Sequence, residues 1–242
     1  MGIEPKNRKI GVLGATGRMG RAAHQALMKA EGIEVVALFD LKQEENLIDD
    51  LPVSTSLEEF ISAGPEVVID FTVAKASLIN LPEIAEAEIH TVVGTSGLTE
   101  EDCKSLGGVF DQSACLIVPN FAIGAVLMMK FAEMASPWFQ TAEIIEFHHN
   151  NKVDAPSGTA IATAEMMASA SQEWAEDPTS RETLTGTRGG VAESNIKIHS
   201  VRMEGMVAHQ EVLLGTTGQS LLIRHDTTDR NAFMPGVVLA AQ

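Results

Sequence analysis

One short stretch of the chain gathers residue types that can bind an anion and move a proton. Residues 146–160 read EFHHNNKVDAPSGTA, with two histidines and a lysine within five positions. A histidine exchanges protons near neutral pH, and a lysine adds positive charge. The Pro-Ser-Gly-Thr turn that follows predicts a helix start, whose free N–H groups and hydroxyls can hold a carboxylate. The candidate residues are His148, His149, Lys152, Ser157, Gly158 and Thr159.

Other interpretations of this stretch are weaker. Adjacent histidines chelate zinc poorly, and no third ligand follows at a useful spacing, so we expect no metal. A hydrolase could use Ser157 as its nucleophile, but no nucleophile elbow surrounds this residue. In an extended strand His148 and His149 point in opposite directions, so one small site cannot easily use both from the same face. Either histidine could also be purely structural.

A glycine loop near the N-terminus could bind a dinucleotide. The loop reads GATGRMG and has a G-x-x-G-x-x-G pattern, because Thr16 replaces the central glycine of the strict G-x-G-x-x-G motif. It follows an expected strand and opens an expected helix, which is where the pyrophosphate of a dinucleotide binds. A tight strand-to-helix turn without a ligand is the alternative. The candidate residues of this loop are Gly14, Ala15, Thr16, Gly17, Arg18 and Met19.

Asp40 ends the second expected strand, twenty residues after the last glycine of the loop. An acid there can accept hydrogen bonds from the adenosine ribose, which favours NADH over NADPH. Leu41 stands where an arginine could bind a 2′-phosphate, although Lys42 is close; otherwise Asp40 is a surface carboxylate. Three further loops follow strands at the same edge of the sheet, where a nicotinamide would lie. They contribute Phe71, Thr72, Gly94, Thr95, Ser96, Val118, Pro119, Asn120 and Phe121.

The elements that must position these residues form two domains. In the first half, Val- and Ile-rich strands without polar alternation are separated by helices, which indicates a parallel sheet covered on both faces. This predicts an α/β, Rossmann-like doubly wound domain for dinucleotide binding over residues 1–121. The expected strands are 9–13, 34–39, 66–71, 90–93 and 115–118, and the expected helices are 19–29 and 81–88. Residues 44–50 are expected to form an acidic surface loop.

After about residue 120 the pattern becomes that of an α+β domain. We expect helices over 122–135 and 157–174 and a strand over 143–147. Strands over 195–201, 210–214 and 220–224 look antiparallel and joined by glycine-containing turns. The domain, residues 122–229, would bind substrate, and its β-rich surface is a plausible oligomer interface.

Composition and charge exclude several classes of partner. The chain has 242 residues, 45% of them hydrophobic, and a net charge of −16 from 17 Lys and Arg against 33 Asp and Glu. Such a charge repels nucleic acid and anionic membranes, and no stretch approaches the ~20 apolar residues of a membrane span. Cys103 and Cys115 lack metal-ligand spacing and are expected to be reduced thiols. We therefore expect a cytoplasmic protein that needs a local positive pocket for an anionic substrate.

The stretch at 146–160 resembles the signature of the dihydrodipicolinate reductase family, also called 4-hydroxy-tetrahydrodipicolinate reductases. That signature runs E-[IL]-H-H-x-x-K-x-D-A-P-S-G-T-A, and only Phe147 departs from it. The resemblance extends to GATGRMGR, VIDFT, VVGTSG, VPNFAIGAV and residues 205–226, and so covers nearly the whole chain.

The resemblance implies reduction of a cyclic unsaturated dicarboxylate by hydride transfer from NADH or NADPH to C4 of its ring, in diaminopimelate and lysine biosynthesis. It implies that His148 donates the proton and that Lys152 is catalytic and binds a carboxylate. His149 and the 157–159 turn would contact substrate, and residues 14–19, 40, 94–96 and 118–121 would bind the dinucleotide. It also implies that residues 230–242 return to the dinucleotide-binding domain and that the chains form homotetramers. Family members usually continue beyond the position of Gln242.

Several alternatives stay open at this point. Ser96 replaces a commoner threonine, and Leu41 replaces an arginine that some members use for the 2′-phosphate, so NADH, NADPH or both could be used. Another small-acid dehydrogenase, of an aspartate or homoserine type, would have a similar domain order. A sensor that binds the dinucleotide without turnover would also contain the glycine loop.

Overall fold

The computed structural model describes residues 7–42, 46–171, 173–192 and 195–242, which form two compact units. The first unit combines the chain up to Phe121 with Phe233–Gln242, and the second is Ala122–Ala232. Each unit has its own buried apolar core. None of the helices in the described ranges is long and apolar enough to cross a membrane.

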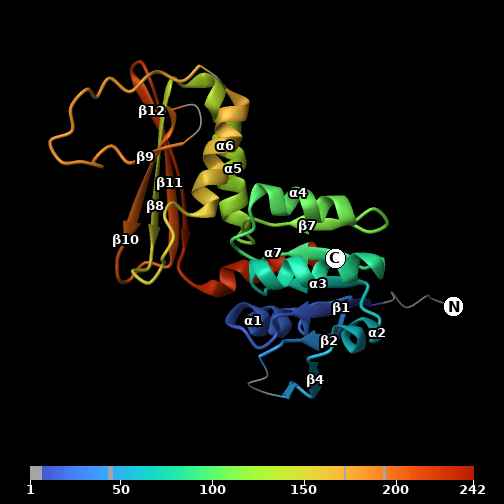
Figure 1. Cartoon of the computed structure of the whole chain (residues 1–242). Coiled ribbons are helices and arrows are strands. Elements are labelled where there is room, and N and C mark those ends of the chain that lie inside the picture. Colours follow the sequence, from blue (N-terminus) through green and yellow to red (C-terminus); the bar gives the residue numbers. More distant parts are fainter. Residues whose placement is uncertain (1–6, 43–45, 172, 193–194) are drawn as a thin grey trace. The chain divides into compact units, whose positions relative to one another are not determined.

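A seven-stranded sheet forms the centre of the first unit (Figure 1). Its strand order is β3-β4-β2-β1-β5-β6-β7, and every pair is parallel except β3 with β4. The strands are β1 (Arg8–Leu13), β2 (Ile33–Phe39), β3 (Leu47–Ile48), β4 (Leu51–Ser54), β5 (Val67–Asp70), β6 (His90–Val93) and β7 (Cys115–Ile117). The predicted strands agree to within one residue at each end, because buried parallel strands show as unbroken apolar runs.

Helices cover both faces of this sheet, which confirms the predicted Rossmann-like doubly wound fold (Figure 1). One face packs against α1 and α7 through a core that includes Ile10, Val12 and Val237. The opposite face packs against α2, α3 and α4 through a core that includes Phe60 and Leu106. The helices are α1 (Arg18–Leu27), α2 (Leu57–Ser62), α3 (Ala74–Glu86), α4 (Glu100–Val109) and α7 (Met234–Ala241).

Two local expectations in this unit were wrong. Helix α3 begins at Ala74, seven residues before the predicted start, and carries Pro82 in its interior. Proline is favoured in the first turn of a helix, so the pattern favoured a start close to it. Part of the expected 44–50 loop forms strand β3, because Ile48 is buried in the core; residues 44 and 45 lie outside the described residues.

The second unit places two helices on one face of a five-stranded sheet of order β12-β11-β8-β10-β9 (Figure 1). The helices, α5 (Ile123–Ala135) and α6 (Gly158–Ala170), pack against each other and bury residues such as Met128, Ile144, Met167 and Val212. The strands are β8 (Thr141–His148), β9 (Gly190–Val191), β10 (Lys197–Arg202), β11 (Ala208–Thr216) and β12 (Gln219–Thr227). Short 3₁₀ helices are η1 (Ser136–Trp138) and η3 (Arg230–Phe233).

Two expectations in this unit also need correction. Strand β10 pairs with β8 in parallel, whereas β11 pairs antiparallel with both β8 and β12. A helix lies between β8 and β10 in the chain, and such a crossover connection joins parallel strands. Helix α6 ends at Ala170 rather than Trp174, although Trp174 is buried in the same core. Trp174 is a loop residue that packs into the core. The periodicity of apolar residues in a sequence cannot distinguish such a residue from one on the buried face of a helix.

Candidate active site

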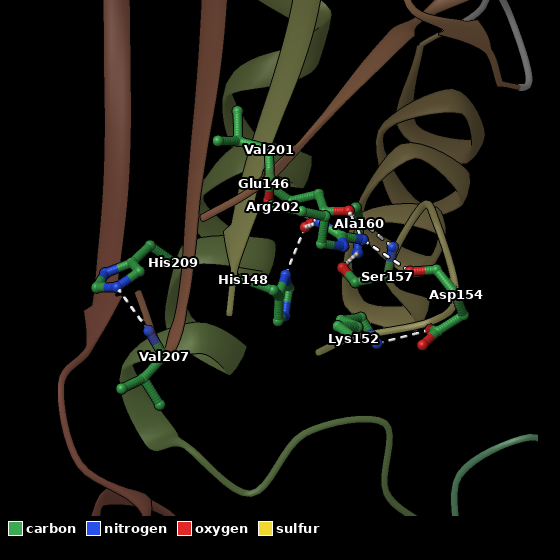
Figure 2. A network of polar contacts seen from close by, with 10 residues as sticks. All are labelled: Glu146, His148, Lys152, Asp154, Ser157, Ala160, Val201, Arg202, Val207 and His209. Atoms are coloured by element: carbon green, nitrogen blue, oxygen red, sulfur yellow. Dashed lines mark hydrogen bonds and ion pairs between the residues drawn. The ribbon is translucent and has the colours of Figure 1, made fainter. Parts of the chain in front are cut away.

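Strand β8 brings Glu146 and His148 to the same face of the five-stranded sheet. Residues two apart on a strand point to one side, and the preceding members of this row, Ala142 and Ile144, are buried in the core. The Nδ1 atom of His148 is hydrogen-bonded to Oε2 of Glu146 (Figure 2). Because Nδ1 is engaged, Nε2 is the ring nitrogen that can serve a substrate.

Glu146 is a fully buried carboxylate with several donors. Arg202, at the end of β10, donates from Nη1 to Oε2 at 2.8 Å and from Nη2 to Oε1 at 2.7 Å. The backbone N–H of Ser157 donates to Oε1 at 3.2 Å. Burial by itself would raise the pKa of Glu146, but hydrogen bonds from His148, Arg202 and Ser200 lower this pKa to about 2. The carboxylate therefore stays ionised near neutral pH.

Lys152 lies in the loop between β8 and α6 and forms an ion pair with Asp154 (Figure 2). The distance from Nζ to Oδ2 is 2.6 Å, and the hydrogen bond from Lys152 lowers the pKa of Asp154. The side chain of Asp154 is 60% exposed, whereas that of Lys152 is 20% exposed. A substrate carboxylate must therefore compete with an exposed aspartate for the ammonium group.

The turn before α6 is arranged differently from the sequence-based prediction. Ser157 is the N-cap of α6: its Oγ accepts the N–H of Ala160 at 3.2 Å, and the residue is buried. Its own N–H is bound to Glu146 and is not free for an anion, so that part of the prediction was wrong. Gly158 and Thr159 are the first residues of the helix, and Gly158 is exposed. His149 follows the last residue of β8 and is half-buried.

The glycine loop follows β1 and leads into α1, as the sequence indicated. Gly14 has a φ of +74°, and a Cβ at Gly20 would lie 2.1 Å from the carbonyl oxygen of Gly14. Only glycine at position 20 therefore lets the helix approach the loop so closely. Gly17 is the N-cap of α1 and provides no side-chain cap, so the first N–H groups of the helix suit a phosphate.

Thr16 explains the departure from the strict glycine motif. Its N–H and its Oγ1 both donate to Oδ2 of Asp40, at 3.1 and 2.5 Å. The backbone N–H of Lys42 donates to Oδ1 of the same carboxylate at 3.0 Å. The threonine thus fixes the orientation of the acid at the end of β2.

A pocket of about 270 Å³ lies beside this carboxylate and fits the adenosine part of a dinucleotide. Asn80 of α3 lines the pocket, is buried, and has an Nδ2 atom without a hydrogen-bond partner in the described part of the chain. An orphaned amide donor in a pocket suits a ring nitrogen or hydroxyl of a ligand. The lining residues are Gly14, Gly17, Phe39, Asp40, Leu41, Lys42, Phe71, Thr72, Val73, Ala76 and Asn80.

A buried polar network connects the loops after β5 and β6. Asp70 is fully buried and accepts hydrogen bonds from the N–H and Oγ1 of Thr72, at 2.8 and 2.6 Å, and from Oγ of Ser77 at 2.5 Å. Ser77 Oγ lies 3.0 Å from Oγ1 of Thr95. The network therefore fixes Thr72 and Thr95 relative to each other.

Two aromatic rings hold the remaining candidate loops together. The rings of Phe71 and Phe121 meet edge to face, with centroids 5.5 Å apart. A Cβ at Gly94 would lie 2.4 Å from one ring and 2.6 Å from the other, so only glycine fits between them. The structure thereby gathers Phe71, Gly94 and Phe121 at one edge of the sheet. The loop after β7 also carries Val118, Pro119 and Asn120, and Ser96 is exposed.

Sequence reasoning did not single out Glu146, Arg202 or Asn80 as site residues. Glu146 could have been found from its position two residues before His148 on an expected strand. Arg202 lies 56 residues from Glu146 in the chain, and only the parallel pairing of β10 with β8 brings it there. Asn80 precedes the helix start that the sequence suggested, so no pattern pointed to it.

Comparisons with known proteins show the family of the chain. The family model described as dihydrodipicolinate reductase, N-terminus, matches residues 8–121, and the model for the C-terminus matches residues 124–242. A relative from Listeria welshimeri, named 4-hydroxy-tetrahydrodipicolinate reductase, is 45% identical over 246 aligned positions, covering 96% of this chain and 92% of the relative. A relative of the same name from Enterococcus faecalis is 44% identical, covering 97% and 93% of the two chains.

Solved structures give the same result. A dipicolinate-bound dihydrodipicolinate reductase from a Paenisporosarcina species has a TM-score of 0.82 at 37% identity, covering 97% of this chain and 93% of that one. A scyllo-inositol dehydrogenase from Lactobacillus casei, with bound NAD(H) and scyllo-inositol, has a TM-score of 0.66 at 11% identity, covering 98% and 87%. The second similarity shows the fold alone.

Proposed function

The chain belongs to the dihydrodipicolinate reductase family, and from that premise we propose which of its residues carry the reaction. It is an oxidoreductase of lysine biosynthesis that reduces 4-hydroxy-tetrahydrodipicolinate, and its first unit binds a nicotinamide dinucleotide. The observation that carries the residue assignment is the pairing of His148 with buried Glu146, beside the loop that holds Lys152.

His148 is the proton donor in this proposal. A bound dinucleotide would supply a hydride to C4 of the substrate ring, and the 4-hydroxyl group would leave as water. The protein must therefore supply one proton for each hydride and hold the two carboxylates. The contact between Nδ1 and the Glu146 carboxylate orients the imidazole and leaves Nε2 to donate. Hydrogen bonds from His148 and Arg202 keep the pKa of Glu146 low, so its carboxylate stays ionised as a partner for Nδ1.

Lys152 and the start of α6 hold the substrate dicarboxylate. The N–H groups of Gly158 and Thr159 lie in the first turn of the helix, where the helix dipole favours an anion. Lys152 adds a positive charge that can turn from Asp154 to a ring carboxylate. His149 contacts the substrate from the end of β8, and Ser157 caps the helix. Together, Lys152 and the start of α6 form the local positive pocket that an acidic protein needs to bind a substrate with two negative charges.

NADH is the preferred cofactor in this proposal. The carboxylate of Asp40 is oriented by Thr16 and by the N–H of Lys42 at the edge of the adenosine pocket. A ribose 2′-hydroxyl can donate to it, whereas a 2′-phosphate would face its negative charge. Asn80 donates to the adenosine part. Gly14, Ala15, Gly17, Arg18 and Met19 bind the pyrophosphate, and residues 71–72, 94–96 and 118–121 bind the nicotinamide end.

A homotetramer joined through the five-stranded sheet completes the proposal. On the sheet face opposite α5 and α6, Leu213 and Leu222 pair across β11 and β12 and are 38% and 55% exposed. Exposed leucines on a sheet face suit burial against another copy. The free cysteines Cys103 and Cys115 suit a reducing cytoplasm. Light scattering coupled to size exclusion should give four times the mass of one chain.

The test of the function is oxidation of NADH and of NADPH, followed at the nicotinamide absorbance band, with freshly prepared 4-hydroxy-tetrahydrodipicolinate. We expect oxidation with this substrate and none with aspartate, aspartate semialdehyde or homoserine. Turnover of an acyclic substrate instead would indicate another small-acid dehydrogenase. Cofactor binding without oxidation of any substrate would indicate a sensor.

A further inference from the structure

The Glu146 carboxylate connects three segments of the chain that meet at the proposed active site (Figure 2). Oε2 is bound to His148 on β8 and to Nη1 of Arg202 on β10. Oε1 is bound to Nη2 of Arg202 and to the N–H of Ser157, which caps α6. One carboxylate therefore fixes the proposed proton donor relative to the helix start proposed to bind the substrate.

Arg202 extends this connection to the loop that carries Lys152. Besides its two bonds to Glu146, its Nη2 donates to the backbone carbonyl of Asp154 at 2.8 Å. Asp154 is the residue that pairs with Lys152. The guanidinium is planar and presents its donors in a fixed fork, so it sets the carboxylate and the loop in one geometry. His148, Ser157 and the Lys152–Asp154 pair are thus each connected to this pair through one or two of these interactions.

Fold stability alone is a weak reason for such a pair. Replacing a buried ion pair by apolar residues of similar volume is often neutral or stabilising, because both charges must leave water. The same strand also carries a comparable cluster, in which Glu143 binds Arg188 and His199. That cluster points to the opposite face of the strand, and the side chain of Glu143 is 34% exposed, against 0% for Glu146.

We propose that Glu146 and Arg202 are positioning residues for the reduction, holding His148 in the orientation and protonation state from which Nε2 donates. This inference rests on the proposed role of His148. In the described part of the chain, Glu146 on β8 and Arg202 on β10 lie at that imidazole, and the Lys152–Asp154 pair lies in the loop that follows β8. His225 on β12 is on the same face of the sheet, in the cross-strand row of Glu146 and Gln210. His209 on β11 is opposite Phe147 and lies on the other face.

The first test compares Glu146→Gln with wild type over a range of pH. The kcat should fall tenfold or more, and KM for NADH should change less than twofold. The alkaline limb of the kcat pH profile reports the group that donates the proton, so loss of the carboxylate that holds Nδ1 should also displace this limb. Glu143→Gln is the matched control, because it removes the same kind of charge from the other face; it should leave the alkaline limb unmoved.

A second variant separates positioning from loss of fold. Glu146→Gln leaves the partly buried Arg202 without its carboxylate partner, whereas Glu146→Gln combined with Arg202→Met removes both charges. The double variant should fold, as judged by far-ultraviolet circular dichroism and NADH binding, and should still show the reduced kcat and the displaced alkaline limb. Recovery of wild-type kcat and pH dependence in the double variant would overturn the proposal.

His148→Gln distinguishes failure of this inference from failure of the proposed function. If His148→Gln retains wild-type turnover, the assignment of the proton donor is wrong, and the positioning role has no basis. If His148→Gln is severely impaired while Glu146→Gln keeps wild-type kcat and pH dependence, the donor stands and the positioning role is wrong.

Discussion

At the scale of single residues, the two cations near the proposed substrate pocket differ in what they can do. Arg202 is bound on both sides of its fork to a carboxylate with no solvent exposure, so it cannot leave Glu146 without stranding a buried charge. Lys152 pairs with an aspartate that is 60% exposed, and such pairs contribute only about 0–1 kcal/mol. The lysine is therefore the cation that an incoming carboxylate can capture.

Lys152→Ala should lower turnover about a hundredfold, because a group that stabilises charge on the substrate is lost. The dissociation constant for NADH should hardly change, since Lys152 is not among the residues proposed to bind the dinucleotide. Steady-state kinetics measure the turnover, and titration of NADH fluorescence measures the dissociation constant. Near-normal turnover would remove Lys152 from the catalytic role.

Asp40→Ala should weaken NADH binding more than NADPH binding. The change removes the acceptor proposed for the ribose 2′-hydroxyl and also removes a negative charge that opposes a 2′-phosphate. We expect KM for NADH to rise about tenfold and KM for NADPH to stay level or fall. Thr16→Val, which removes one of the donors that orient Asp40, should shift the ratio in the same direction but less. An equal loss for both cofactors would contradict the ribose assignment.

Sequence patterns found the residues whose chemistry is local and missed those that depend on pairing. His148, Lys152 and the turn before α6 are neighbours in the chain, so spacing was enough to group them. The N–H of Ser157 looked available because its partner, Glu146, lies on a strand eleven residues earlier. Thr16 looked like a defect in a glycine motif until its bonds to Asp40 were visible.

At the scale of elements, the approach of α1 to the end of β1 depends on Gly20. A Cβ there would meet the backbone oxygen of Gly14 at 2.1 Å, and backbone cannot move aside as a flexible side chain can. The helix would have to shift away from the loop, and with it the N–H groups proposed to bind the pyrophosphate. Packing, rather than phosphate binding alone, thus requires a glycine at this position.

Gly20→Ala should lower the free energy of unfolding of the first unit by about 1–3 kcal/mol, the usual cost of overpacking. NADH should bind at least tenfold more weakly. Gly107→Ala in α4 is the matched control: the added methyl meets nothing within 4 Å, and replacing a helical glycine should raise stability by about 0.5–1 kcal/mol. Thermal unfolding with and without NADH measures both variants. A Gly20→Ala protein as stable as wild type would show that the helix can shift without cost.

The elements themselves were predictable where burial imposes a pattern. Five adjacent strands of the first unit, β2, β1, β5, β6 and β7, read directly from apolar runs rich in Val and Ile. Helix α3 did not, because Val73 gives no side-chain cap to mark its start and Pro82 interrupts its interior. The parallel pairing of β10 with β8 was also missed, since the sequence of a strand does not record which neighbour it joins.

At the scale of the whole molecule, the residues proposed to bind the dinucleotide and those proposed to handle the proton and the dicarboxylate belong to different units. The glycine loop, Asp40 and Asn80 belong to the first unit, whereas Glu146, His148 and Lys152 belong to the second. NADH should therefore stabilise the first unit by mass action, by about 2.7 kcal/mol at a hundredfold excess over its dissociation constant. At low pH, protonation of the buried Glu146 carboxylate should destabilise the second unit.

The pH dependence of unfolding should report Glu146. Its pKa is about 2 in the folded protein and has an ordinary value of 4.5 in an unfolded chain, because the bonds from His148 and Arg202 outweigh the effect of burial. A lowered pKa contributes stability that is fully present above pH 4.5 and is lost as the pH falls toward 2. The full contribution is about 3 kcal/mol.

Urea unfolding at a series of pH values between 5 and 2 should therefore show a steep loss of stability in the wild type. The double variant Glu146→Gln with Arg202→Met lacks this carboxylate, so its free energy of unfolding should fall less over the same window. Other carboxyls with lowered pKa values, among them Glu143 and Asp154, remain in the variant and should keep part of the slope. The slope of the free energy of unfolding against pH is set by the number of protons taken up on unfolding. Equal slopes in the two proteins would therefore mean that the partners of Glu146 do not lower its pKa in the folded protein.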